Sequence, residues 1–204
     1  MSKAIYYIKN DFSAATFLSI RNSKKSLIIC FSTMYMRLKS YLIGVNVGKK
    51  TKWGGITQIE RFPMSEITIG KRCVFNSNSI FNQRGIRHCI IQTGKIGAKI
   101  KIGNHCGFSG VSIVADCCVE IGNNVMVGAN TLIGDRDDHP ERLHTSPSKT
   151  YIGDNVFIGM HCIIMKGVSI GKNSIIGAGS IVTKNIPENV IAVGVPCKVI
   201  KAIN

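Results

Sequence analysis

Apolar residues recur at every sixth position along most of this chain. A period of six fits neither an α-helix, whose faces repeat every 3.6 residues, nor a simple strand, whose faces alternate. A short strand followed by a turn, repeated many times, does produce it. The apolar positions, here called anchors, are all Ile, Val or Phe: Ile69, Phe75 and Phe81; Ile102, Phe108 and Val114; Ile121, Val127 and Ile133; Ile152, Ile158 and Ile164; and Ile170, Ile176 and Val182.

Three consecutive hexapeptides predict one triangular coil of eighteen residues. The anchor fills the interior, and a small or β-branched residue four positions later fits the tighter corner. Gly follows nine of the fifteen anchors and is expected to permit unusual dihedral angles at the turn. Stacked coils bury a continuous core, as in other solenoids. The expected coils are 69–86, 102–119, 121–138, 152–169 and 170–187, with an irregular or partial coil at 87–101.

The same register places four of the eight cysteines at the small interior position: Cys73, Cys106, Cys118 and Cys162. A thiol there acts as a compact hydrophobic group. A zinc site is disfavoured because no CxxC pair exists. The N-terminal sequence MSKAIYYIKNDF lacks the layout of a signal peptide, so we expect cytosolic thiols, a cytoplasmic protein and no metal.

Positive charge is concentrated in the first 52 residues. The whole chain has 26 Lys and Arg against 11 Asp and Glu, a formal net charge of +15. Ten of the basic residues and one of the acids lie in 1–52, so this segment alone carries +9. Its most apolar stretch, 27–36, has half of the roughly 20 residues that a membrane-spanning helix needs. Residues 26–42 fit one or two amphipathic helices.

Two interpretations of the basic segment stay open. It is either a helical cap packed on the repeat domain, or an amphipathic segment that makes peripheral contact with anionic lipid. Nucleic acid is not expected as a partner, because aromatic residues do not interleave with basic ones beyond the first fifty residues. The chain is therefore divided into a basic amphipathic helical segment at 1–52, a repeat domain at 53–187 and a short tail at 188–204.

A polar insertion interrupts the repeat at 139–151. A solenoid needs no such excursion for stability, and long loops in compact folds are often functional. Asp135, Asp137 and Asp138 come directly before His139. A neighbouring carboxylate can hold an imidazole in the tautomer that accepts a proton and can stabilise the imidazolium that forms. Spacing alone gives equal weight to this interpretation and to a solvated loop without a role.

The insertion GDRDDHPERL and the C-terminal run from YIGDNVFIGM to GVPCKVIKAIN resemble the maltose/galactoside O-acetyltransferase branch of the hexapeptide-repeat acyltransferases. They are most similar to acetyltransferases that modify bacterial surface polysaccharides. The resemblance is strong from about residue 102 to the C-terminus, weaker over 53–101 and absent in the first fifty residues. It implies an all-β solenoid of the left-handed parallel β-helix type, with the hand taken from the resemblance and not from the periodicity.

The resemblance also implies a reaction. His139 corresponds to the catalytic histidine of the family, which takes a proton from an acceptor hydroxyl as that hydroxyl attacks the thioester carbonyl of acetyl-CoA. Asp135 or Asp137 orients the imidazole, and the backbone N–H of Met160 stabilises the oxyanion. His144 is a rival base, but it lacks the preceding acids.

The coenzyme is expected along the last coils. The long, thin pantetheine arm suits a groove between parallel coils, with backbone groups of Gly159 and Ala178 lining it. The coenzyme phosphates require cations, and the resemblance supplies candidates near them: Thr183, Lys184, Lys198 and Lys201. The alternative for these lysines is that they only solvate the C-terminal edge.

The acceptor side departs from the galactoside enzymes, which have an Asn where the coil register places Ser109 in this chain. This difference favours another sugar over a simple galactoside or maltose. Asn82, Gln83 and Arg84 are further candidates for the acceptor site, suggested only by their proximity in the register.

The predicted function is an acetyl-CoA-dependent O-acetyltransferase that acetylates a sugar hydroxyl of a bacterial surface polysaccharide or its precursor. The resemblance further implies a homotrimer with active sites between neighbouring β-helices. The alternatives are an antibiotic or amino-sugar acetyltransferase and a non-catalytic β-helical scaffold. A zinc hydratase is disfavoured because only His105 and His161 share a register.

Overall fold

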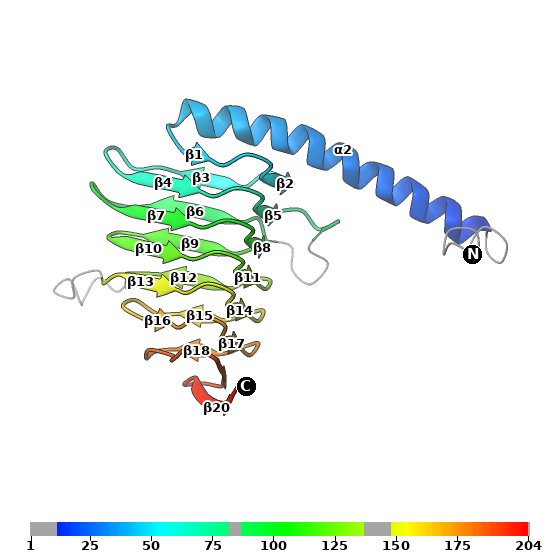
Figure 1. Ribbon diagram of the computed structural model, residues 1–204. Coiled ribbons are helices and arrows are strands. Elements are labelled where there is room, and N and C mark those ends of the chain that lie inside the picture. Colours follow the sequence, from blue (N-terminus) through cyan, green and yellow to red (C-terminus); the bar gives the residue numbers. More distant parts are fainter. Residues whose placement is uncertain (1–11, 82–86, 137–147, 204) are drawn as a thin grey trace.

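The structure, a computed structural model, describes residues 12–81, 87–136 and 148–203 (Figure 1). A long helix, α2 (Phe12–Leu42), lies across one end of a three-sided stack of short strands. From β1 to β18 the chain visits three sheets in turn, so that each strand up to β15 pairs in parallel with the strand three further along.

The three sheets, here called A, B and C, form the three sides of the prism. Sheet A contains β1 (Asn46–Val47), β4 (Glu66–Ile69), β7 (Lys99–Ile102), β10 (Cys118–Ile121), β13 (Thr150–Ile152) and β16 (Ser169–Ile170). Sheet B contains β2 (Lys52–Gly54), β5 (Val74–Asn76), β8 (Gly107–Ser109), β11 (Met126–Val127), β14 (Phe157–Ile158), β17 (Ile175–Ile176), β19 (Val190–Val193) and β20 (Lys198–Ala202). Sheet C contains β3 (Gln58–Glu60), β6 (Ile90–Thr93), β9 (Ser112–Ala115), β12 (Leu132–Gly134), β15 (Ile163–Ile164) and β18 (Ile181–Val182). This arrangement confirms the predicted left-handed parallel β-helix with a helix at its N-terminal end.

The solenoid is longer than the predicted repeat domain at both ends. Val47, Trp53 and Ile59 form a first coil, so the stack begins at β1 and not at residue 53. Four extra residues at the turn before β4 hide this coil, because they break the six-residue spacing to the next anchor. At the other end β19 continues sheet B in parallel, and β20 folds back against it in the antiparallel sense.

The second coil departs from the predicted register. Its third interior residue is Ile91, in β6, and not Phe81. Phe81 is partly exposed, and the Lys25 ammonium lies 5.7 Å from its ring centroid. The chain makes an excursion between β5 and β6 before sheet C resumes. The segment 87–101, expected to be irregular, supplies two regular strands, β6 and most of β7.

One side of the third coil is shorter by a residue than the repeat predicts, and the side after it is longer by a residue. Ile113 and Ala115 are the buried residues of β9, while the predicted anchor Val114 points outward. The predicted anchor Ile121 lies inside the next strand, β10, and side chains alternate along a strand. Val119 is therefore inside β10, and the Cys118 thiol, expected in the interior, lies outside near the Glu120 carboxylate, at 3.8 Å.

Large apolar side chains stack along the interior from coil to coil. The Trp53 and Phe75 rings lie 5.9 Å apart between centroids, and Phe75 and Phe108 lie 5.0 Å apart, both pairs nearly parallel. Below them Val127, Ile158 and other branched residues continue the column. Each fully buried side chain of this size contributes about 1.5–3 kcal/mol. The core is thus a continuous column with no boundary between coils.

The glycines after the anchors are required by close approach and not by dihedral angles. A Cβ on Gly103 would lie 2.6 Å from the carbonyl carbon of Gly122 in the next coil, which no side chain tolerates. The left-handed residue of each turn comes two positions later, as at His105 and Asn124, with φ of 61° and 57°. The expectation that these glycines supply unusual dihedral angles is therefore wrong.

Three of the four predicted interior thiols are buried and donate to the next coil. Cys73, Cys106 and Cys162 each direct Sγ at a glycine carbonyl of the following coil, at 3.2, 3.1 and 3.2 Å. Burial raises the pKa of the Cys162 thiol. At the same corner position Thr131 donates to the Gly159 carbonyl at 2.9 Å. The small residue of the repeat is therefore a hydrogen-bond donor as well as a space-filler.

Helix α2 caps the first coil. Met36 is fully buried against it. Ser32 donates to the Trp53 carbonyl at 2.5 Å, and Trp53 N–H donates to Thr33 Oγ1 at 3.1 Å. The Arg37 guanidinium also reaches carbonyls of the first coil. The cap interpretation is confirmed, with one helix, and no helix in the described ranges has the length and hydropathy of a membrane span.

We predict that Gly103→Ala destabilises the fold and that Gly134→Ala does not. A Cβ on Gly103 meets the backbone of the next coil, and overpacking of this kind costs about 1–3 kcal/mol. A Cβ on Gly134 would lie 3.7 Å from its nearest neighbour, the Val114 carbonyl oxygen, in ordinary contact. Chemical denaturation of both variants measures the difference, and an equal loss would refute the role assigned to these glycines.

Candidate functional site

A groove runs along the edge of the prism where the chain passes from sheet B to sheet C. Its volume is about 490 Å³. Four residues expected at the site line it together, namely Ser109, Gly159, Met160 and Ala178. Its other walls are formed by Phe81, Gly128, Ala129, Phe157, Ile175, Ile176 and Gly177. The repeat thus brings residues from four successive coils to one surface.

The corner between sheets A and B shows how these turns are normally closed. The second residue after each anchor has a backbone N–H that points along the stack. Asn104 N–H donates to Asn123 Oδ1 at 2.9 Å, and Asn123 N–H donates to Asp154 Oδ1 at 2.6 Å. Lys71 N–H is bound in the same way by Asn104, at 2.8 Å. Each N–H is therefore satisfied by the side chain of the next coil.

The corner between sheets B and C lacks these side-chain acceptors. Ala129, Met160 and Ala178 occupy the equivalent positions there, and none has a polar side chain. Within the described part of the chain their N–H groups have no acceptor, although the Met160 carbonyl accepts from Gly179 N–H at 2.8 Å. Backbone N–H groups left open beside a groove are suited to bind a carbonyl oxygen or a developing oxyanion.

The side chain of Ser109 is held by a residue that the sequence analysis missed. Asn76 Nδ2 donates to Ser109 Oγ at 3.2 Å, and the two residues are register partners in β5 and β8. Both also line a second hollow of about 370 Å³ beside the groove. The signal available in the sequence was position, because Asn76 follows its anchor just as Ser109 follows Phe108.

A backbone hydrogen bond joins the two described ends of the insertion. Ser148 N–H donates to the Asp135 carbonyl at 3.1 Å. Lys149 pairs with Glu120 at 2.5 Å, which holds the pKa of that carboxyl below its usual range. Thr150 and Tyr151, counted above in the insertion, belong to β13. The insertion leaves the prism at the corner between sheets C and A.

Asp135 is a structural residue of this corner. Its carboxylate is fully buried and accepts three backbone N–H groups, from Asp116, Cys117 and Cys118, at 2.7, 2.8 and 2.5 Å. It thereby fixes the turn of the preceding coil and the start of the insertion. Asp137, His139 and His144 lie outside the described residues.

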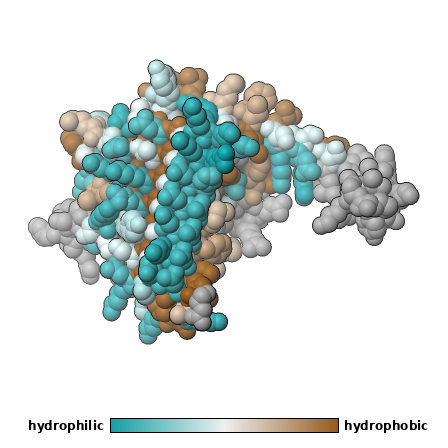
Figure 2. Space-filling model, in the orientation of Figure 1, coloured by the Kyte–Doolittle hydropathy of each residue, from teal (hydrophilic) through white to brown (hydrophobic). Residues whose placement is uncertain are grey.

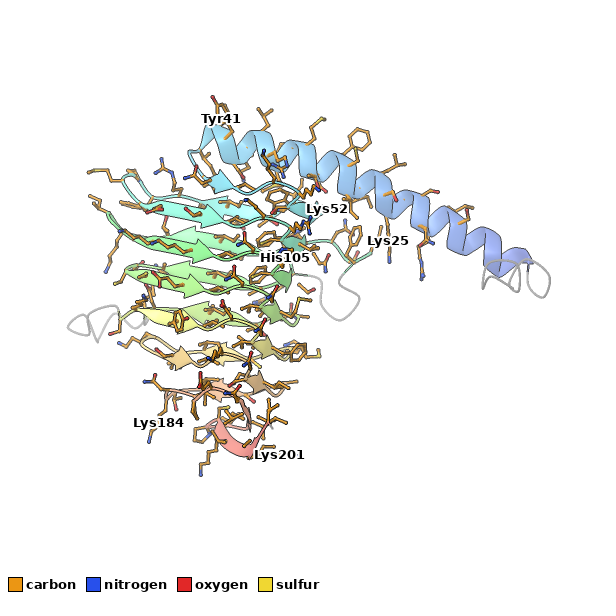
Figure 3. All side chains as sticks on the ribbon, viewed as in Figure 1. Lys25, Tyr41, Lys52, His105, Lys184 and Lys201 are labelled. Carbon is orange, nitrogen blue, oxygen red and sulfur yellow. The ribbon has the colours of Figure 1, made fainter. Side chains whose placement is uncertain are left out.

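The lysines expected near the coenzyme do not line the groove of their own chain. Lys184 and Thr183 are exposed after β18, at the same corner from which the insertion leaves. Lys198 and Lys201 are exposed on β20. Lys201 lies at the C-terminal end of the prism (Figure 3). Asn82 and Arg84, expected at the acceptor, lie outside the described residues. His105 and His161 occupy left-handed turn positions, and no cluster of His, Cys, Asp and Glu suited to a metal occurs among the described residues.

Comparison with known proteins supports the family. The bacterial transferase hexapeptide family (six repeats) matches residues 149–184. Galactoside O-acetyltransferase of Lactococcus lactis is 35% identical over 167 residues, which cover 76% of this chain and 79% of that enzyme. Galactoside O-acetyltransferase of Escherichia coli is 46% identical over 114 residues, 53% of this chain and 56% of that enzyme, so the match spans about half of its length.

A solved structure supports the fold. An N-acyltransferase from Bacillus cereus, in complex with dTDP and 3-hydroxybutyryl-CoA, superposes with a TM-score of 0.66 at 21% identity. The superposition covers 82% of this chain and 88% of that protein. Together with the relative that covers three quarters of the sequence, these comparisons establish that the chain belongs to the hexapeptide-repeat acetyltransferases, in the group of the galactoside O-acetyltransferases.

Proposed function

We propose that this protein transfers an acetyl group from acetyl-CoA to a sugar hydroxyl of a bacterial surface polysaccharide or its precursor. The observation that carries the proposal is the groove between sheets B and C, where Met160 and Ala178 leave backbone N–H groups open and Ser109 stands beside them. Galactoside O-acetyltransferases among its relatives favour a sugar as the acceptor. Ser109 and the Asn76 amide supply hydroxyl and amide groups for hydrogen bonds to that sugar.

The proposed reaction combines the open N–H groups of the groove with His139 as the base. His139 removes the proton of the acceptor hydroxyl as its oxygen attacks the thioester carbonyl carbon. The carbonyl oxygen becomes an oxyanion, which the Met160 N–H stabilises. When the tetrahedral intermediate collapses, the C–S bond breaks and the CoA sulfur takes the proton from His139. The products are the acetyl ester and free CoA.

Asp137 is the better candidate to orient His139. Three backbone N–H groups already occupy the Asp135 carboxylate, which is fully buried. Asp135 then acts as a positioning residue that fixes where the insertion begins. Asp137 thus orients the imidazole, and Asp135 holds the start of the insertion in place.

The site is completed by a second subunit in a homotrimer. The insertion that carries His139 and the exposed Lys184 both belong to the corner between sheets C and A, whereas the groove lies between sheets B and C. A head-to-tail ring places one corner of each subunit against a different corner of its neighbour. Sheet B supports such packing, because apolar side chains point outward along it: Val74, Met126, Phe157 and Ile175.

Different surfaces of the protein bind different parts of the coenzyme in this proposal. The pantetheine arm lies along Gly159 and Ala178, where a Cβ on Gly159 would meet the Ala178 backbone nitrogen at 2.5 Å. The coils are therefore in close contact, and the arm has to follow the outer surface of the corner. Thr183, Lys184, Lys198 and Lys201 are exposed and available for the coenzyme phosphates.

His139→Ala is expected to lower kcat by about 10²–10⁴, the usual contribution of a general base. Release of thiol from acetyl-CoA is measured over a panel of nucleotide sugars, lipid-linked oligosaccharides, simple glycosides and amino sugars. His144→Ala is the matched control and keeps its rate. If the His139 variant retains most of its turnover, the assigned base is wrong, and a preference for amino sugars would favour the N-acetylating alternative.

Met160→Pro is expected to lower kcat by about 10²–10³, because proline has no N–H to stabilise the oxyanion. His161 has a φ of 55°, so Met160 precedes a left-handed residue, a turn position at which proline is common. The fold should therefore tolerate the change. Met160→Ala keeps the N–H and should keep the rate within a few-fold, and an equal loss in both variants would assign the effect to the side chain.

Mixing the two inactive subunits tests whether neighbours share a site. In co-expressed His139→Ala and Met160→Pro chains, a site with an intact insertion and an intact groove forms in about a quarter of the contacts of a random head-to-tail ring. Activity should recover to about that fraction of wild type. No recovery in mixed oligomers, or a sedimentation mass near the 22.2 kDa of one chain, would contradict the shared site.

A further inference from the structure

Helix α2 presents an apolar stripe on the face that points away from the β-helix. The stripe consists of Leu27, Phe31, Met34, Leu38 and Tyr41, which are all exposed and follow one another in steps of four and three residues. This spacing keeps them on a single side of a helix. Tyr41 is 81% exposed and points away from the prism (Figure 3).

The opposite side of α2 is the one that packs on the first coil. Ser32, Met36 and Ser40 are buried there, with Met36 completely inaccessible. The apolar stripe therefore takes no part in packing α2 against the first coil. In Figure 2 apolar surface follows the upper edge of the molecule, where α2 lies. A contiguous apolar surface of this kind marks an interaction site.

A neighbouring groove widens the apolar surface. It has a volume of about 440 Å³ and lies between α2 and the first two coils. Leu27, Phe31 and Tyr35 form its helical wall, and Ile56 contributes an exposed side chain from the first coil. The stripe and this groove share two residues, so they form one continuous surface.

Positive charge accompanies this surface without any acid to balance it, although Arg37 binds carbonyls of the first coil and Lys25 lies over the Phe81 ring. Arg21, Lys24, Lys25, Arg37 and Lys39 lie on α2, and Lys49, Lys50 and Lys52 follow it in the first coil. Between residues 12 and 59 the sequence contains no Asp or Glu. The surface is therefore both apolar and strongly cationic.

The positive charge of this surface indicates which kind of partner binds to it. A second copy of α2 packed on the stripe would bring two sets of cations together with no acid between them, and like charges at such distances repel. An anionic bilayer accepts the apolar side chains below its headgroups and neutralises the lysines at its surface. Phe, Leu, Met and Tyr beside Lys and Arg are the composition of helices that lie in the plane of a membrane surface.

We propose that the outward face of α2 docks on the surface of an anionic lipid bilayer. The helix lies in the interface without crossing it, and the β-helix extends away from the membrane. Neighbouring coils are spaced about 4.8 Å apart. The groove formed around β8, β11, β14 and β17 would then lie about 10–24 Å along the stack from β2, since these strands are two to five places from β2 in sheet B, and farther still from the outward face of α2.

This geometry narrows the acceptor, an extension that rests on the proposed function. A groove held that far from the headgroups reaches sugars of a lipid-linked glycan that stand away from the lipid. It does not reach a sugar attached directly to the lipid phosphate. The membrane docking itself is independent of the activity and is tested without a substrate.

Vesicle flotation of the full chain tests the docking. Vesicles of phosphatidylcholine with phosphatidylglycerol are compared with vesicles of phosphatidylcholine alone. The wild type should float with the anionic vesicles, and less so at high salt. The variant Phe31→Ser/Met34→Ser/Leu38→Ser should lose at least tenfold in partitioning, and Lys24→Glu/Lys39→Glu should lose about fivefold per charge removed.

A matched control separates the stripe from exposed apolar surface in general. Val199→Ser/Ile200→Ser removes exposed apolar side chains from β20, at the opposite end of the prism, and should float like the wild type. Equal flotation of the stripe variant and the wild type, or no flotation of either, would overturn the proposal. A stripe variant with a changed sedimentation mass would also overturn it and would assign the stripe to a contact between subunits.

Discussion

The close contact between successive coils is the constraint on which the rest of this structure depends. At many of the residues that follow an anchor, as at Gly103 and Gly159, the backbone of one coil approaches the next so closely that only glycine fits. The interior is then continuous, with Trp53, Phe75 and Phe108 stacked through it. The corners become columns of backbone groups at a regular spacing. What the backbone groups of each column can bind depends on the side chain two positions after the anchor.

The column at the corner between sheets A and B differs at that position from the column at the corner between sheets B and C. Asn104, Asn123 and Asp154 close the first with hydrogen bonds from coil to coil. Met160 and Ala178, in the equivalent place on the second, cannot do so, and their N–H groups stay open beside the groove. In the proposed function, a binding surface for a thioester arises from the absence of polar side chains at this corner. The proposed catalytic base then comes from the insertion at another corner.

Much of the fold was predictable because each coil repeats the same physical requirement. The six-residue period located most interior residues, and it failed where the chain adds or omits residues between coils. Phe81 belongs to an excursion, Val114 faces outward because the turn before it is a residue short, and Cys118 faces outward because the connection after β9 is a residue longer. Residues added or omitted between coils shift the register without changing the kinds of residue present. The shift is therefore seen only in the hydrogen-bonded pairing of the strands. The groove residues Ser109, Met160 and Ala178 were predictable from the register and the resemblance, but Asn76 and the structural role of Asp135 depend on contacts between coils. The helix was expected, whereas its exposed stripe could be distinguished from its packed face only once Met36 was located in the cap.

The central claim is that the open N–H column between sheets B and C receives the thioester. A crystal structure with acetyl-CoA and a non-reactive acceptor tests it most directly. The account predicts the thioester carbonyl oxygen at about 3 Å from the Met160 nitrogen, with pantetheine along Ala178 and a His139 side chain of the neighbouring subunit opposite. Coenzyme bound at the corner between sheets A and B, or in the groove with its carbonyl turned away from Met160, would contradict it.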